Sequence, residues 1–225
     1  GFAGGIGFGT IFLKKGYSLQ RTYALSKLES AMMPAIQVGL LVLVVTAPAF
    51  IFFSQKGPGA MHAPWLISLA AGLVVGGLSQ VSRLCTVGGF RDLFLFKKSI
   101  LIFGYLAVLV GVFLVNISFG NFHLGFENQP VAHADGLWNF LGMALAGFCS
   151  VLLGGCPLRQ LIMTGEGNSD AAVTVLGLAA GAAFAHNFGL AASGAGPTLN
   201  GQIAVGVGFV VALIIAILNT KRANA

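Results

Sequence analysis

The sequence predicts an all-α, polytopic membrane protein with about seven spans, parallel internal repeats, and helices that are broken or re-entrant at two cysteine motifs. Three observations lead to this fold class. Hydrophobic residues make up 56% of the 225 positions and charged residues only 8%, whereas an average soluble domain is about 25% charged. Apolar runs of membrane-spanning length recur along the chain. The 33 glycines exceed the usual share of roughly 7%, as expected where membrane helices pack closely.

The first apolar run is shorter than the others. As a helix, residues 1–13 reach about 20 Å against a hydrocarbon core of roughly 30 Å, so we interpret them as the end of a helix whose upstream part is missing. The other spans are predicted at residues 31–53, 64–82, 99–119, 137–155, 171–192 and 201–219. We therefore treat residues 1–225 as a single transmembrane domain, the downstream portion of a longer protein.

Basic residues predict the orientation of these spans. With seven alternating spans, eleven of the twelve lysines and arginines fall in loops on one side, and Lys56 alone falls on the other. The positive-inside rule then places the basic loops and the C-terminus in the cytoplasm. The formal charge of +6 follows from this bias, so nucleic acid is not a predicted partner.

An internal repeat is visible in the second and third quarters of the sequence. Trp65 and Trp138 both open a predicted span, and three pairs align at a constant offset of 71 positions: Gly76 with Gly147, Ser79 with Ser150, and Cys85 with Cys156. Both copies enter from the same side, so the repeat-like units, at about 64–135 and 136–222, are parallel. Duplicated halves with a substrate at their interface are a common transporter design.

Each repeat-like unit carries a polar interruption that contains a cysteine. Non-helical backbone at membrane depth is tolerated only where protein or a water-filled cavity covers it, and Gly88-Gly89 and residues 154–157 are the predicted breaks. Free N–H groups at helix starts suit an anion, and a thiol is a soft, polarizable group that suits sulfur or selenium. The candidate substrate-binding residues are Cys85, Cys156, Arg83, Gly88, Gly89, Arg91, Gly155 and Arg159.

Less specific interpretations of these residues stay open. Each cysteine alone also fits a small buried hydrophobe, and the arginines also fit cytoplasmic anchors or, for Arg91, a structural pair with Asp92. His186 and Asn187 are candidates for proton coupling, although a packing role fits them equally. Cys149 lies in a regular span and is predicted to pack. No cysteine or histidine spacing indicates a metal site, and no cofactor is predicted.

At these motifs the sequence resembles the YeeE/YedE family of bacterial membrane proteins, within the sulfur-transport superfamily, and most of all its selenium-metabolism YedE branch. The resemblance is carried by SRLCTVGGFRD at 82–92, LGGCPLRQ at 153–160 and AHNFGL at 185–190. Family members are longer than this chain. The resemblance implies a bacterial inner-membrane transporter, not an enzyme, for a small sulfur anion such as thiosulfate or for a selenium compound. It also implies that Cys85 and Cys156 contact the substrate along its path.

Two other classes of function fit the same residues. A membrane thiol enzyme, or sulfur or selenium relay, would hand the atom to a cytoplasmic carrier protein through an adduct on Cys85 or Cys156. A non-transporting membrane subunit would merely pack the two cysteines. The predicted partners are therefore a small sulfur or selenium anion, the lipid bilayer, and a possible cytoplasmic sulfur or selenium carrier.

Overall fold

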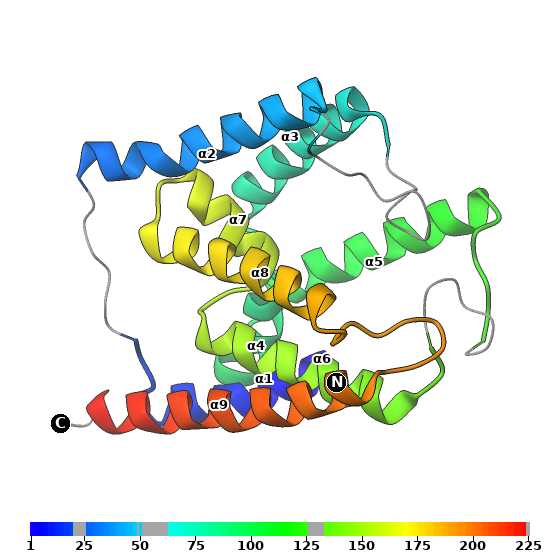
Figure 1. Cartoon of the computed structure of the whole chain (residues 1–225). Coiled ribbons are helices and arrows are strands. Elements are labelled where there is room, and N and C mark those ends of the chain that lie inside the picture. The colour runs from blue at the N-terminus through cyan, green and yellow to red at the C-terminus, as the bar shows by residue number, and fades with distance from the viewer. Residues whose placement is uncertain (20–25, 49, 51–62, 126–132, 224–225) are drawn as a thin grey trace. The chain divides into compact units, whose positions relative to one another are not determined.

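The computed structural model describes residues 1–19, 26–48, 50, 63–125 and 133–223. Every regular element in this part of the chain is a helix, as the sequence predicts. In chain order the helices are α1 (Phe2–Lys14), α2 (Lys27–Thr46), α3 (Trp65–Ser82), α4 (Thr86–Phe96), α5 (Ile100–Ser118), α6 (Gly136–Leu152), α7 (Pro157–Gly165), α8 (Ser169–Asn187) and α9 (Leu199–Ala223) (Figure 1).

Five helical segments in the described part of the chain are long and apolar enough to cross a membrane: Trp65–Phe96, Ile100–Ser118, Gly136–Gly165, Ser169–Asn187 and Leu199–Thr220. The first contains α3 and α4 and the third contains α6 and α7, so both cysteine motifs interrupt a candidate span. Such segments identify a multi-pass membrane protein. α1 and the apolar part of α2, Ala31–Thr46, are shorter. The number of seven spans therefore stays a prediction.

The orientation of the spans also stays a prediction, because two of its basic residues, Arg21 and Lys56, lie outside the described residues. α2 begins at Lys27, four residues before the predicted span 31–53, and Pro34 lies inside the helix. α2 ends at Thr46, and Ala47 has a positive φ of 40°. The residue before a proline is disfavoured in the helical region, which agrees with the end of α2 two residues before Pro48.

The chain divides into two compact units. Unit 1 comprises Gly1–Arg21, Leu84–Arg159 and Leu176–Ala225, and unit 2 comprises Thr22–Arg83 and Gln160–Val175. The single transmembrane domain and the two repeat-like units stay predictions. Both cysteine motifs, from Leu84 onward and up to Arg159, belong to unit 1.

Glycines allow α1 and α6 to approach closely within unit 1. A Cβ atom at Gly5 would overlap the backbone of Ala144, and one at Gly147 would overlap the backbone of Phe2. In Figure 1, α1, α6 and α9 lie side by side. Because lipid chains are as apolar as helix side chains, such backbone approach supplies much of the packing energy between membrane helices.

A hydrophobic cluster in unit 1 joins α1, α6 and α9 around Phe148, whose side chain is fully buried. Tyr17 lies in this cluster and its hydroxyl donates to the carbonyl oxygen of Leu152 at 3.2 Å. Leu152 ends α6, so its carbonyl lacks a partner within the helix. Burial raises the pKa of Tyr17 to about 12, because the charged phenolate would lose its hydration. The neutral tyrosine thus anchors α6 one turn before the Cys156 motif.

In unit 2 a side-chain cap starts α8. The Oδ1 atom of Asn168 accepts from the N–H of Ala171 at 2.9 Å, and Asp170 lies in the first turn of the helix, where a carboxylate is stabilised by the helix dipole. Gln80 Nε2 on α3 donates to Glu166 Oε1, which follows α7. Both contacts involve segments that flank the cysteine motifs in the sequence.

Candidate functional site

The first cysteine motif turns the chain from α3 into α4. Arg83 adopts a left-handed conformation with φ 52°, and Cys85 is extended with φ −151°. The Sγ atom of Cys85 accepts from the N–H of Gly88 at 3.3 Å, so the thiol occupies the N-cap position where serine, threonine, asparagine or aspartate is usual. The break therefore falls at residues 83–85.

This position corrects one prediction. Gly88 and Gly89 do not form the break; they belong to the first turns of α4 and are buried. Gly89 lies against α5, where an added Cβ atom would be 3.2 Å from the backbone nitrogen of Ile102. The glycine pair thus serves close helix packing, which sets α4 against α5 with its N-terminus at Cys85.

The second cysteine motif does break the chain where the sequence predicts. α6 ends at Leu152, Gly154 has φ +84°, and the N–H groups of Gly154 and Gly155 donate to Val151 O and Ser150 O, both at 3.1 Å. These two hydrogen bonds together form a Schellman motif, which favours glycine at the left-handed position. Pro157 then begins α7, at a position where the missing N–H of proline costs nothing.

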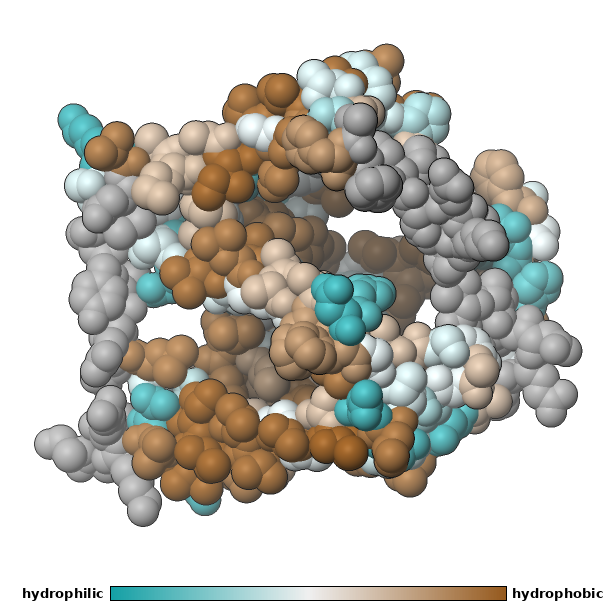
Figure 2. Space-filling model, viewed as in Figure 1, coloured by the Kyte–Doolittle hydropathy of each residue, from teal (hydrophilic) through white to brown (hydrophobic). Residues whose placement is uncertain are grey.

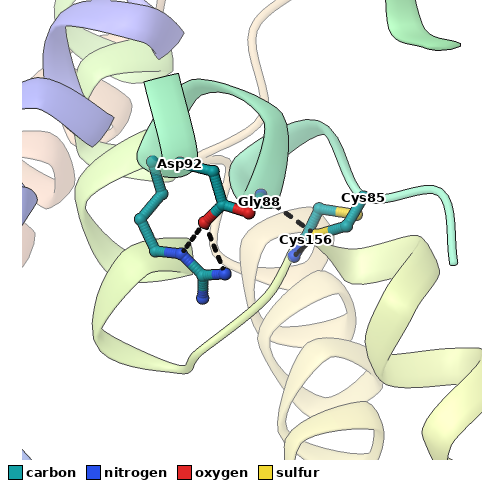
Figure 3. Close-up of polar contacts among 5 residues, drawn as sticks. Cys85, Gly88, Asp92 and Cys156 are labelled. Atoms are coloured by element: carbon teal, nitrogen blue, oxygen red, sulfur yellow. Dashed lines mark hydrogen bonds and ion pairs between the residues drawn. The ribbon is translucent and has the colours of Figure 1, made fainter. Parts of the chain in front are cut away.

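The two thiols meet in unit 1. The backbone N–H of Cys156 donates to Cys85 Sγ at 3.5 Å, and the two side chains are hydrogen-bonded to each other. Figure 3 shows their sulfur atoms side by side between the starts of the two helices. Cys85 is 8% exposed and Cys156 is 4% exposed, so the pair is buried as well as adjacent.

The two cysteines have matching surroundings. Each thiol accepts from the N–H three residues later in its own helix, Gly88 for Cys85 and Arg159 for Cys156. Each also accepts from the other motif: Cys85 from the N–H of Cys156, and Cys156 from the N–H groups of Thr86 and Val87. The internal repeat itself stays a prediction, but the local capping is the same at both of its cysteines.

The electrostatics of this arrangement favour negative charge. A helix N-terminus carries the equivalent of about half a positive elementary charge together with unpaired N–H donors. The N-termini of α4 and α7 both lie at the thiol pair. Five backbone N–H groups therefore point at two soft sulfur atoms, which suits a thiolate or a bound anion.

Apolar side chains enclose the pair. Ile6 from α1, Val87 from α4 and Val151 from α6 are each at most 2% exposed and form one cluster with the two cysteines, against which Phe2, Leu13 and Phe90 pack. In such apolar surroundings each hydrogen bond to sulfur is stronger than in solvent. The N–H groups of Thr86 and Val87 were not among the predicted site residues. Their role follows from their place in the first turn after Cys85, which becomes apparent once Cys85 is known to cap α4.

The predicted arginines differ in what they contribute. Arg91 is paired with its neighbour, through Nη2 to Asp92 Oδ1 at 2.8 Å and Nε at 2.9 Å, which is the structural alternative left open by the sequence. Arg83 is exposed at the end of α3. Arg159 is half-buried and supplies its backbone N–H to Cys156. Apart from the hydrogen bond between the two thiols, the hydrogen bonds at the thiols thus come from backbone N–H groups.

The remaining predicted residues lie elsewhere in the chain. His186 and Asn187 are exposed at the end of α8, and Asn187 Nδ2 donates to the Ala183 carbonyl oxygen at 2.8 Å. Cys149 lines an open groove of about 620 Å³ formed by α6, α8 and α9. Its lining contains the amide of Asn200 but no charged group, so the groove is a poor anion site. Figure 2 shows a continuous hydrophobic surface along α9.

The comparison with protein families agrees with this geometry. A family model described as sulphur transport matches residues 81–222, a range that contains both cysteine motifs, the thiol pair and His186. No curated protein and no solved structure matches the chain significantly. The matched range covers more than half of the sequence, and the long apolar helices are those of a membrane transporter. The chain therefore belongs to the YeeE/YedE sulphur transport family.

Proposed function

We propose that this protein takes up a small sulfur- or selenium-containing anion, such as thiosulfate, through a path lined by Cys85 and Cys156. The observation that carries the proposal is the convergence of two thiols and two helix N-termini at one buried point. The site would lie in a bacterial cytoplasmic membrane, with the basic loops and the C-terminus in the cytoplasm.

The thiols and the N–H groups have complementary roles in this proposal. An anion entering the membrane loses its hydration, and each hydrogen bond to a charged group returns about 1.5–3 kcal/mol. On binding, the N–H groups at the starts of α4 and α7 exchange their hydrogen bonds to sulfur for hydrogen bonds to the oxygen atoms of the anion, while the soft thiols contact its terminal sulfur or selenium atom. Sulfate, which has only hard oxygen atoms, lacks the second contact.

The arginines act at longer range. Arg83 and Arg159 attract the anion toward the path. Arg91 contributes less, because Asp92 neutralises its charge. His186 and Asn187 remain the candidates for coupling transport to protons. Gly88, Gly89 and Gly155 support the site through the backbone: Gly155 terminates α6, and Gly88 leaves the space beside Cys85 Sγ open.

Uptake of labelled thiosulfate by cells that produce the full chain tests this proposal. Cys85→Ser and Cys156→Ser keep a polar group at each cap but remove the soft sulfur, and we expect each to lower the apparent affinity about tenfold, the equivalent of 1.4 kcal/mol. Cys149→Ser is the matched control and should transport normally. Unchanged uptake in both Cys85→Ser and Cys156→Ser would refute the proposal. Competition by selenosulfate then distinguishes selenium from sulfur substrates.

The adjacency of the thiols also favours a second function. A relay would hold the sulfur or selenium atom as an adduct on one thiol and pass it to a cytoplasmic carrier. Mass spectrometry of the chain after incubation with thiosulfate separates the two functions. A covalent adduct on Cys85 or Cys156 supports the relay, whereas unmodified cysteines with intact uptake support transport alone.

A further inference from the structure

The thiol pair can undergo a reaction that anion binding does not use. We propose that Cys85 and Cys156 form a site of reversible oxidative modification, where a peroxide converts the two thiols into an intramolecular disulfide. The further consequence, that the disulfide stops transport, rests on the proposed function, because it removes the two soft groups that contact the substrate. The chemistry at the sulfur atoms does not depend on which anion is carried.

The geometry supports the formation of this bond. Cys85 Sγ already lies 3.5 Å from the backbone nitrogen of Cys156, the side chains are hydrogen-bonded to each other, and their sulfur atoms are neighbours in Figure 3. Both residues lie at helix N-caps, outside the regular turns, so small rotations of their side chains do not disturb a helical ladder. A redox-active cysteine is typically found beside a second, resolving cysteine.

The reaction needs only a peroxide as oxidant. The thiolate of one cysteine attacks the O–O bond, forming a sulfenic acid and releasing hydroxide, and the sulfur atom is oxidised while the peroxide is reduced. The thiol of the other cysteine then attacks the sulfenic sulfur. An S–S bond forms, the S–O bond breaks, and water leaves with the thiol proton. The released hydroxide takes up the proton that the first thiol lost on forming its thiolate, which gives a water molecule. Two thiols and one hydrogen peroxide thus give one disulfide and two water molecules.

The backbone N–H groups indicate which thiol reacts first. The thiolate is the reactive form and is stabilised by helix N-termini. Cys156 Sγ accepts from three backbone N–H groups, those of Thr86, Val87 and Arg159, whereas Cys85 Sγ accepts from two, those of Gly88 and Cys156. Cys156 is therefore the attacking residue and Cys85 the resolving one. Hydrogen peroxide is smaller than the anions proposed to pass, so a path that admits them admits the oxidant.

The test counts thiols in the purified full chain in detergent. After treatment with hydrogen peroxide the protein is denatured, alkylated with N-ethylmaleimide and weighed by intact mass spectrometry. The sequence contains three cysteines, and we expect the oxidised chain to take one label, at Cys149, and to recover all three labels after dithiothreitol. Cys149→Ser should form the same disulfide, whereas Cys85→Ser should leave Cys156 as a sulfenic or sulfinic acid.

Three results would overturn the proposal: three labels after peroxide, a loss of labels that dithiothreitol does not reverse, or a disulfide that requires Cys149. In proteoliposomes, oxidised Cys149→Ser protein should lose uptake and regain it on reduction. Full uptake by the disulfide form would overturn the inference that the disulfide stops transport. The failure of the proposed function is distinguishable, because unchanged uptake in both Cys85→Ser and Cys156→Ser refutes that function and leaves the thiol count of the parent chain unaffected.

Discussion

The thiol of Cys85 has a structural role as a helix cap that can be separated from any role in transport. Its Sγ atom accepts from the N–H groups of Gly88 and Cys156, at 3.3 Å and 3.5 Å. In Cys85→Ala both donors lose this partner. Loss of an N-cap side chain costs about 0.5–2 kcal/mol, and a second buried donor left unpaired costs about 1–3 kcal/mol. We therefore expect Cys85→Ala to destabilise unit 1 by about 1.5–5 kcal/mol.

Cys85→Ser is the informative comparison. Its hydroxyl can cap α4 through Gly88, since serine is a preferred N-cap residue, so we expect it to recover at least half of the lost stability while uptake stays impaired. The assay is thermal unfolding of the purified chain in detergent, with Cys149→Ala as the control for the loss of a thiol without a cap. If Cys85→Ser and Cys85→Ala unfold at the same temperature, or if Cys85→Ala is as stable as the parent, the capping account is wrong.

Two further predictions concern the packing of unit 1. Gly5→Ala should lower the unfolding temperature, because its Cβ atom would overlap the backbone of Ala144, whereas Gly72→Ala, with no neighbour within 4 Å, should not; equal effects in the two variants would contradict the close packing of α1 on α6. Tyr17→Phe should lose about 0.5–1.5 kcal/mol with its hydrogen bond to Leu152. Because burial raises the pKa of Tyr17 from 10.0 to about 12, its contribution is full below pH 10 and lost as pH rises through 12. Denaturant titrations should show this loss in the parent and not in Tyr17→Phe, and a loss of equal size in both would contradict it.

The helix breaks at the cysteine motifs were only partly predictable from the sequence. Gly154 and Pro157 mark the second break, because a left-handed glycine ends a helix and a proline begins one. The first break lacks this signal. Arg83 adopts the left-handed conformation without being a glycine, and the neighbouring glycine pair was the more obvious candidate. Residue type identifies a helix break only where the break uses the special backbone conformations of glycine or proline.

Gly88 and Gly89 lie in α4, whose close packing on α5 was not apparent from the sequence. Gly89 approaches the backbone of Ile102 on α5, an interaction that residue types do not encode. The capping role of Cys85 was hidden for a similar reason, since cysteine is not a preferred N-cap residue. The constant offset between Cys85 and Cys156 predicted a pair of thiols, and the structure places the two side chains next to each other. The offset could not predict that each sulfur atom would accept from backbone N–H groups of both motifs.

Protection of the thiols by substrate tests the central claim most directly. The full chain is treated with a small alkylating reagent in the presence or absence of thiosulfate, and labelling of each cysteine is followed by mass spectrometry, with Cys149 as the internal control. The account predicts that thiosulfate slows labelling of both Cys85 and Cys156, that sulfate does not, and that Cys149 is unaffected. Equal labelling rates of Cys85 and Cys156 with and without thiosulfate and the related selenium anions would contradict it.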